Sequence, residues 1–543
     1  MNALAFFKRV ALALCALTAF GAAPAAAKVA TGVQPYLEVQ QVLNAELNGG
    51  DVLTYTSIAA GVDAGVTTRR VRAQISYRYE KRIGWGDDPA DDDAHAGIAQ
   101  IEADIIPNLL RFNAGALATR ARADGLGPVF GLSRAGNGGV SKIYSLYAGP
   151  DLSTRVGALD VAGSYRFGLV EIDNQRLRGV PLAPGAIQLD RFESSTNHSL
   201  SASVGMGVGE LPFGWTVAGG YYLEQADRLD QEFEGRFIRG DIVVPVAPTL
   251  ALTAGVGYEK IESSQQDILR AADGTPVVTP GGRLIGDPSR PRLLSYYTDG
   301  LIWDAGAIWR PTRRTELQAR VGRRYGGTTV IGSLTHQFSD RYGFNASVYD
   351  GVESFGRLLI ADLAAVPVDF DVRRNPLGNN IGGLGGCVFG SDPGTGTCFD
   401  DAFQAIAGSS FRNRGANLLF SGGRGPWDFN VGANYSSRRY FAPIVTQGFA
   451  LDRRTDESVS LYAGVNRDLS RTSSVSFDGY ASWFDSGLAG TDGATSAGIT
   501  GSYYQSFLFD RLQGQAALGL FTTDSNGIDS TVASALLGLR YNF

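Results

Sequence analysis

Histidine, cysteine and methionine are scarce in this chain of 543 residues, which has three, three and two of them. His95, His198 and His336 lie far apart in the sequence, and their spacing gives neither a catalytic triad nor a metal cluster. We therefore expect no enzyme activity, no cofactor and no metal site. The net charge of −6 comes with no basic stripe, which argues against a nucleic-acid partner.

Long apolar runs are also missing after residue 27, so we expect no membrane-spanning helix in the mature chain. Residues 1–27 themselves have the three parts of a secretory signal peptide. Lys8 and Arg9 precede an apolar run from Val10 to Phe20, and small residues end at Ala27. We expect cleavage there, which would also remove Cys15, and a mature chain, residues 28–543, that forms one exported domain.

Glycine and aromatic residues are plentiful, at 71 residues and 10% of the chain, and they favour strands. Between Val71 and Glu80, apolar residues alternate strictly with Arg, Gln, Ser and Glu. The same two-sided pattern recurs in residues 97–105, 301–310, 316–321, 428–438 and 475–483. One face of each strand is oily, and the other has charges that a dry core would exclude.

About 22 such segments of roughly 10 to 15 residues follow one another. The sequence therefore predicts an all-β fold: a transmembrane antiparallel up-and-down β-barrel of about 22 strands, an even number between roughly 18 and 24. We expect it in the outer membrane of a Gram-negative bacterium, in contact with lipid and lipopolysaccharide.

Short and long connections alternate along the chain, as they do in barrels with short periplasmic turns and long extracellular loops. The predicted short turns are residues 107–108, 150–155, 209–214, 245–249, 311–314, 339–341, 422–426, 468–471 and 510–511. The predicted long loops are residues 83–95, 123–141, 173–193, 263–296, 353–412 and 442–455, of which 263–296 and 353–412 are the largest.

The last residues have a pattern of their own. Leu537, Leu539, Tyr541 and Phe543 fall on one side of a strand that ends with the chain. A terminal Phe preceded by alternating apolar and aromatic residues resembles the signal by which outer-membrane proteins are recognised for barrel assembly. The barrel-assembly machinery is therefore an expected partner.

Charges of both signs are predicted to face the lumen, which indicates a hydrated interior. They are Arg72, Arg78, Glu80, Glu102, Asp104, Arg111, Asp304, Arg320 and Arg324. Two roles stay open for them, namely ion pairs that cross-link the inner wall and selection of solutes.

Cys387 and Cys398 are an even pair at close spacing in an exported chain, which predicts a disulfide in the largest loop. Residues 400–408 after it are predicted to form a short amphipathic helix with Phe403, Ile406 and Ala407 on one side. The loop either folds inward and narrows the lumen or lies solvated on the surface. Strands begin soon after Lys28, so we expect no plug domain ahead of the barrel.

A second loop is strongly acidic. Its carboxylates are Asp87, Asp88, Asp91, Asp92 and Asp93. They suit a divalent ion, shared with lipopolysaccharide, but the spacing lacks the glycine and glutamate of an EF-hand. A solvated acidic loop is the alternative reading.

The stretch Gly306–Ser339 contains Trp309-x-Pro311, then Gly322-Arg323-Arg324-Tyr325, then Gly332-Ser333-Leu334-x-His336. These motifs resemble an uncharacterised outer-membrane β-barrel family associated with exosortase, or PEP-CTERM, systems. The resemblance covers roughly 35 residues and implies a porin-like barrel linked to exopolysaccharide production.

These observations predict a porin-like channel for passive or loop-gated passage of hydrophilic solutes, with a saccharide or exported polysaccharide among the candidates. The first alternative is a structural or surface-binding barrel without transport. The second is an outer-membrane enzyme.

Overall fold

The computed structural model describes residues 30–50, 52–85, 93–122, 140–174, 192–279, 284–371, 374–378, 386–404, 406–443, 454–487, 493–525 and 528–543. The predicted signal peptide and Asp87, Asp88, Asp91 and Asp92 lie outside these residues. Within them, no helix is long and apolar enough to cross a membrane.

Twenty-two antiparallel strands form one sheet. They are β1 (Ala30–Glu46), β2 (Val52–Thr67), β3 (Val71–Trp85), β4 (Asp93–Ile106), β5 (Leu110–Arg122), β6 (Val140–Val156), β7 (Leu159–Asn174), β8 (Ser194–Met206), β9 (Gly214–Ala226), β10 (Gln231–Ala247), β11 (Leu250–Gln265), β14 (Leu293–Thr312), β15 (Thr315–Arg324), β16 (Gly327–Ser339), β17 (Tyr342–Glu353), β20 (Ser410–Arg424), β21 (Trp427–Phe441), β22 (Thr455–Asp468), β23 (Ser473–Asp485), β24 (Ala494–Phe507), β25 (Leu512–Ser525) and β26 (Ile528–Asn542).

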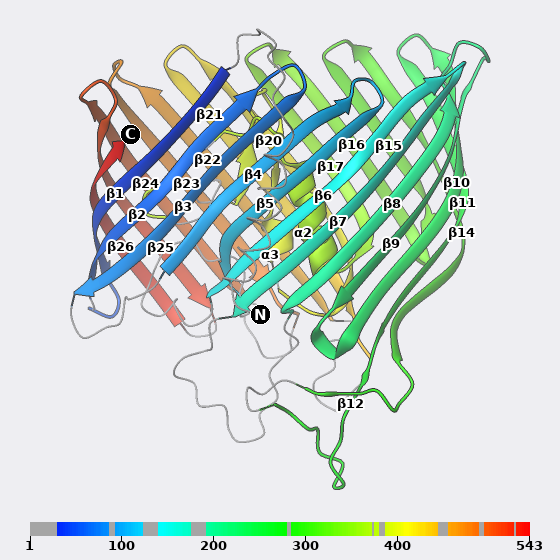
Figure 1. Cartoon of the computed structure of the whole chain (residues 1–543), viewed down its shortest axis with the longest axis horizontal. Helices are drawn as coiled ribbons and strands as arrows, with labels where there is room; N and C mark the ends of the chain where they lie inside the picture. The colour runs from blue at the N-terminus through cyan, green and yellow to red at the C-terminus, as the bar shows by residue number, and fades with distance from the viewer. Residues whose placement is uncertain are drawn as a thin grey trace.

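The sheet closes on itself, as predicted. Each strand pairs with the next along the chain, and β1 pairs with β26 from Tyr36↔Asn542 to Glu46↔Val532. Closure leaves no unpaired strand edge in the membrane, where a free backbone N–H or C=O is costly. The strands tilt around the barrel wall (Figure 1).

The two faces of the strands have opposite environments. In β1, Leu37, Val39 and Leu43 are exposed, while Tyr36 and Glu38 on the other face are buried. The outward side chains form an apolar surface around a barrel with a polar interior, which is the arrangement that lipid outside and water inside require. The chain is an outer-membrane β-barrel.

The two rims differ as the sequence predicts. The short turns line one rim, at the top of Figure 1, and the longer connections leave the other. One predicted turn is wrong: residues 150–155 continue β6, and the chain reverses at Gly157 and Ala158. Pro150 suggested a turn because it lacks an N–H, but β6 tolerates it, with pairing to β7 skipped between Ala148 and Asp151.

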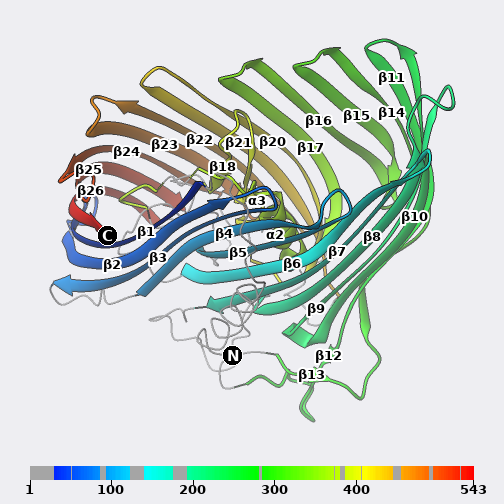
Figure 2. The ribbon, with the colours of Figure 1, turned by 45° about the horizontal axis from the view of Figure 1, so that its top comes forward.

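The connections at the extracellular rim contain the remaining elements: a 3-10 turn η2 (Arg228–Asp230), β12 (Asp267–Ile268), β13 (Gly286–Asp287), α2 (Phe355–Ala365), β18 (Cys387–Phe389), β19 (Gly396–Cys398) and α3 (Asp400–Phe403). The β12–β13 connection projects from the extracellular rim as an arm (Figure 1). By contrast, α2, α3 and β18 lie within the barrel (Figure 2).

Candidate functional site

The connection between β17 and β20, residues 354–409, enters the barrel, and we call it the lumenal segment. Its helix α2 contacts β5 to β8 and buries Phe355, Leu359 and Leu363. These side chains join inward residues of the wall, including Ile143 and Val170, in one apolar cluster. Gly168 of β7 lies against Ile360, and any side chain there would collide with it. The wall is therefore shaped to receive α2.

The second half of the lumenal segment packs on the opposite wall. Cys387 and Cys398 form a disulfide that joins directly paired residues of the β18–β19 hairpin. Both sulfurs lie over Gly432 of β21, where an added Cβ would be 2.8 Å from the Cys387 Sγ. With Phe389, the disulfide joins wall residues such as Tyr462 and Tyr480 in a second apolar cluster. The segment thus bridges the lumen from β5–β8 to β20–β26.

Hydrogen bonds fix the lumenal segment at several points. The Nε2 of Gln100 donates to the Leu363 carbonyl at 2.6 Å, and the Nε2 of Gln74 donates to the Phe370 carbonyl at 2.6 Å. On the other side, the Gly394 N–H donates to the Ser421 hydroxyl at 2.8 Å. These contacts satisfy backbone groups that would otherwise be buried without partners.

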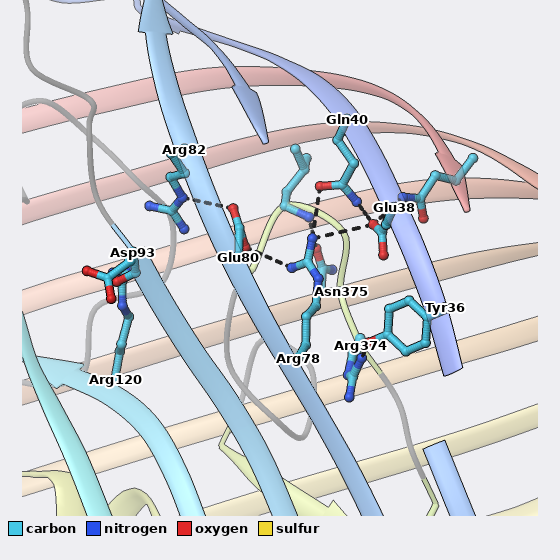
Figure 3. Close-up of polar contacts among 12 residues, drawn as sticks. Tyr36, Glu38, Gln40, Arg78, Glu80, Arg82, Asp93, Arg120, Arg374 and Asn375 are labelled. Carbon is cyan, nitrogen blue, oxygen red and sulfur yellow. Dashed lines mark hydrogen bonds and ion pairs between the residues drawn. The ribbon is translucent and has the colours of Figure 1, made fainter. Parts of the chain in front are cut away.

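Arg374 connects the lumenal segment to a row of charged residues on β1 and β3 (Figure 3). It pairs with Asp63 at 3.4 Å and donates to the hydroxyls of Tyr36 and Ser76. Beside it, Arg78 bridges Glu80 at 2.8 Å and Glu38 at 3.4 Å.

Carboxylates gather where the lumenal segment meets β20 to β22. A hydrogen bond links Asp362 of α2 and Asp401 of α3. The Ser460 hydroxyl donates to Asp400 at 2.9 Å, and the Asn413 amide lies 3.5 Å from Asp401. Arg438, at 0% exposed, faces this group from β21.

Burial, and next the Asp401 carboxylate, raise the pKa of Asp362 well above its usual range. Burial also raises the pKa of Asp401, against the lowering effect of Arg438. The pKa of Asp400 rises to about 7, again mainly through burial. The docked segment therefore holds protons that a solvated one would release.

Contacts across the extracellular rim narrow the mouth above β14 to β17. The hydroxyls of Ser263 in β11 and Ser410 in β20 are 2.7 Å apart, although four strands separate them in the sheet. Nearby, the rings of Tyr296 and Phe441 have centroids 4.4 Å apart. The strands between these contacts, β15, β16 and β17, have 10, 13 and 12 residues, whereas β11, β14, β20 and β21 have 15 to 20. We call the two contacts the mouth contacts.

Among the residues that the structure describes, two cavities border the lumenal segment. One, of about 500 Å³, lies between α2, α3 and the wall of β15 to β17, and Gln318, Arg320, Ser333 and Tyr349 line it. The other, of about 690 Å³, is near the periplasmic rim, where Asp478, Tyr504 and Arg540 line it. The described part of the lumen is thus a partly filled, polar passage.

All nine charges predicted to face the lumen lie on inward faces, and each belongs to an ion pair. Arg72 pairs with Glu102 at 2.9 Å, and Arg111 pairs with both Glu102 and Asp104. Arg320 pairs with Asp304 at 3.2 Å and with Asp241 at 2.7 Å. Arg324 pairs with Glu259. Arg78 and Glu80 pair with each other, as described above. These ion pairs cross-link the inner wall, and each charge is balanced by a nearby partner.

The other predicted sites lie in different parts of the barrel. Asp93 is the one described member of the acidic loop, and it begins β4 and pairs with Lys142 at 2.9 Å. Leu537, Leu539, Tyr541 and Phe543 point outward, with Leu537 70% exposed. The motif residues of Gly306–Ser339 fall on β14 to β16, with Tyr325 at φ 55° in the tight turn between β15 and β16.

The three histidines all occupy the outward face, away from the lumen. The hydroxyls of Tyr77, Tyr165 and Thr315 lie 2.7, 2.9 and 2.7 Å from the Nδ1 atoms of His95, His198 and His336. Each histidine also contacts aromatic rings. They are placed like the aromatic residues that line membrane interfaces.

Sequence reasoning missed α2 and described α3 as longer than it is. Residues 355–365 read FGRLLIADLAA, and the spacing of Phe355, Leu358, Leu359 and Leu363 is helical. The predicted helix over 400–408 shortens to Asp400–Phe403, although Phe403, Ile406 and Ala407 are buried as expected. The connection 353–412 leaves the extracellular rim as predicted, and of its two predicted placements the inward one is confirmed, because its described residues between 354 and 409 pack inside the barrel.

No family model and no curated protein matches this chain. Solved barrels that are similar include the FrpB iron transporter from Neisseria meningitidis, at 10% identity and a TM-score of 0.44, over 94% of this chain and 82% of that one. The ferric-catecholate import receptor Fiu from E. coli is 11% identical, with a TM-score of 0.46 over 93% and 81%. BauA, the ferric preacinetobactin receptor from Acinetobacter baumannii, is 11% identical, with a TM-score of 0.46 over 95% and 81%.

Proposed function

We propose that this chain is a gated passage for hydrophilic solutes through the outer membrane, and that its lumenal segment is the gate. The observation that supports this most is the position of residues 354–409, which bridge the lumen and pack on two opposite walls. A cavity remains between the segment and the wall of β15 to β17, and polar groups such as Gln318, Arg320 and Ser333 line it. Such a wall replaces part of the hydration of a passing solute.

The gate is held by contacts that can be released without unfolding the barrel. The segment uses hydrogen bonds, a carboxyl cluster and two apolar patches, whereas the 22 strands pair independently of it. The mouth contacts add a second closure at the extracellular rim. Opening would require the release of both the lumenal segment and the mouth contacts.

Recording ion current through the mature barrel in a planar bilayer tests this function. The variant replaces residues 355–404 with a short Gly/Ser linker, and the matched control removes residues 271–283 from the external arm. We expect rare current steps in the intact protein and in the control, and frequent, larger steps after the lumenal deletion. Equal currents in all three folded proteins would contradict a gate in this segment.

The solute class is a separate question, for which the resemblance of Gly306–Ser339 suggests exported polysaccharide. Flux of neutral oligosaccharides into proteoliposomes that contain the lumenal deletion addresses it. Entry that falls with oligosaccharide size supports a hydrophilic passage. Current without any sugar entry would restrict the passage to ions.

The external arm favours surface binding as a second candidate function. β12 pairs with β13, and bridges at Arg270↔Pro276 and Val278↔Leu284 extend the arm beyond the rim (Figure 1). The arm-tip deletion used above separates the two functions. It should leave current unchanged and remove any adhesion of the barrel to envelope polymer.

A further inference from the structure

Two arginines flank an outward tryptophan at the periplasmic rim of β20 to β22. Arg424 pairs across the strands with Trp427, and Trp427 pairs with Arg467, so the three side chains share one face. The Arg467 guanidinium lies over the indole ring, 4.7 Å from its centroid. That face is the lipid side, because Leu461 and Val465 of β22, which alternate with buried residues, are exposed on it.

Neither arginine has a carboxylate partner among the residues that the structure describes, and both are exposed. Elsewhere on the same rim, exposed arginines do pair: Arg155 with Asp160 at 2.7 Å and Arg314 with Asp340 at 3.3 Å. The adjacent carboxylates Asp428 and Asp468 fall on alternate positions of their strands, facing away from Arg424 and Arg467. The pair therefore presents two uncompensated positive charges.

Aromatic rings continue this face toward the middle of the membrane. Phe429 stacks on Tyr342 with centroids 5.3 Å apart and on Phe420 with centroids 5.7 Å apart. Aromatic side chains at this depth sit at the boundary between headgroups and acyl chains. The arginines thus lie at headgroup level, with a flat apolar surface above them for an acyl chain.

We propose that Arg424, Trp427 and Arg467 form a binding site for an anionic phospholipid of the inner leaflet of the outer membrane. The two guanidinium groups hold the phosphate, which their planar forks suit better than an ammonium does. The acyl chains lie over Phe429 and Phe420. A zwitterionic headgroup brings its own cation close to the two arginines, so it binds less well.

Native mass spectrometry of the refolded barrel in detergent with phosphatidylglycerol or phosphatidylcholine tests this proposal. We expect phosphatidylglycerol to be retained preferentially. R424Q/R467Q should weaken its binding roughly 30-fold, because each arginine near an anionic surface contributes about a factor of five. R424K/R467K should retain part of the binding, since it keeps the charge but loses the fork.

The control R155Q/R314Q removes two rim charges that already have carboxylate partners, and it should leave lipid binding unchanged. An equal loss in this control would overturn the proposal in favour of a general effect of net charge. Displacement of the lipid by soluble glycerol phosphate at equal concentration would overturn the assignment to a lipid. No preference for phosphatidylglycerol in the parent protein would overturn the site altogether.

Discussion

The wall of the lumen has two halves that are built differently. Where the lumenal segment docks, the inward residues include Ile143, Val170 and Tyr462, together with glycines that admit the segment. On β14 to β17, the inward residues are instead Asp304, Gln318, Arg320 and Ser333. The wall thus contains both a docking surface for the lumenal segment and a polar surface, which a uniform pore wall would not need.

The largest expected effect comes from a bulky side chain at Gly432, where the disulfide of the lumenal segment packs on the wall. G432L places a side chain against the Cys387–Cys398 disulfide, which has little freedom to move, at a cost of about 3 kcal/mol to docking. We expect the segment to leave the wall and the current to approach that of the lumenal deletion. As a matched control, G240L adds the same side chain where nothing lies within 4 Å. If G432L folds and stays closed, packing at Gly432 does not hold the gate.

Loss of the disulfide should act in the same direction but less strongly. The bridge closes a loop with a sequence separation of 11, so its removal in C387S/C398S costs about 2 to 3 kcal/mol of order in the hairpin. Part of that cost should appear as more frequent opening in bilayer recordings. Reduction of the parent protein should reproduce the effect, and a barrel that closes equally well without the bridge would contradict it.

Acidity should favour the closed state. Asp362, Asp400 and Asp401 have raised pKa values when the segment is docked, with that of Asp400 at about 7, so the docked state holds more protons than the released one. Docking is therefore strongest at low pH, and it weakens as the pH rises from the ordinary carboxyl range to about 7.

We expect the open probability to increase about tenfold between pH 5 and pH 8. D362N/D400N should flatten this dependence, whereas D273N, an exposed aspartate of the external arm, should leave it unchanged. An open probability that falls as the pH rises would show that the carboxyl cluster does not hold the gate.

The smallest effect belongs to the polar half of the wall. Among the residues that the structure describes, R320Q leaves Asp241 and Asp304 paired with Arg239 alone, so the wall becomes more negative. In the lumenal deletion, we expect R320Q to raise the cation-to-anion permeability ratio, measured from the reversal potential, about twofold. In the intact barrel, we expect little change in gating. A large change in gating would mean that this half also supports the segment.

Much of the barrel could be predicted from the sequence because its signals are local and repeated. Alternation such as that in Val71–Glu80, together with the tight turns, predicted about 22 strands, which is the number observed, and the terminal Leu537 to Phe543 pattern matched the closing strand. The turn predicted at Pro150 was wrong, because one missing N–H is tolerated within a strand.

The docking of the lumenal segment was harder to predict, because it depends on contacts between distant residues. The two wall glycines that contact the lumenal segment, Gly168 and Gly432, cannot be told apart in the sequence from the others among its 71 glycines. The apolar spacing of 355–365 was readable as a helix, but nothing local says that it packs on β5 to β8. The mouth contacts likewise join residues far apart in the sequence, such as Ser263 and Ser410.

Thiol accessibility on the two halves of the wall tests the central claim most directly. V170C introduces a thiol under the docked α2, and S333C introduces one on the polar half. In the folded barrel, we expect S333C to react with a small alkylating reagent at least about tenfold faster than V170C, since V170C reacts only when the segment opens. Deletion of residues 355–404 should remove the difference. Equal rates in the intact barrel would contradict a gate seated inside it.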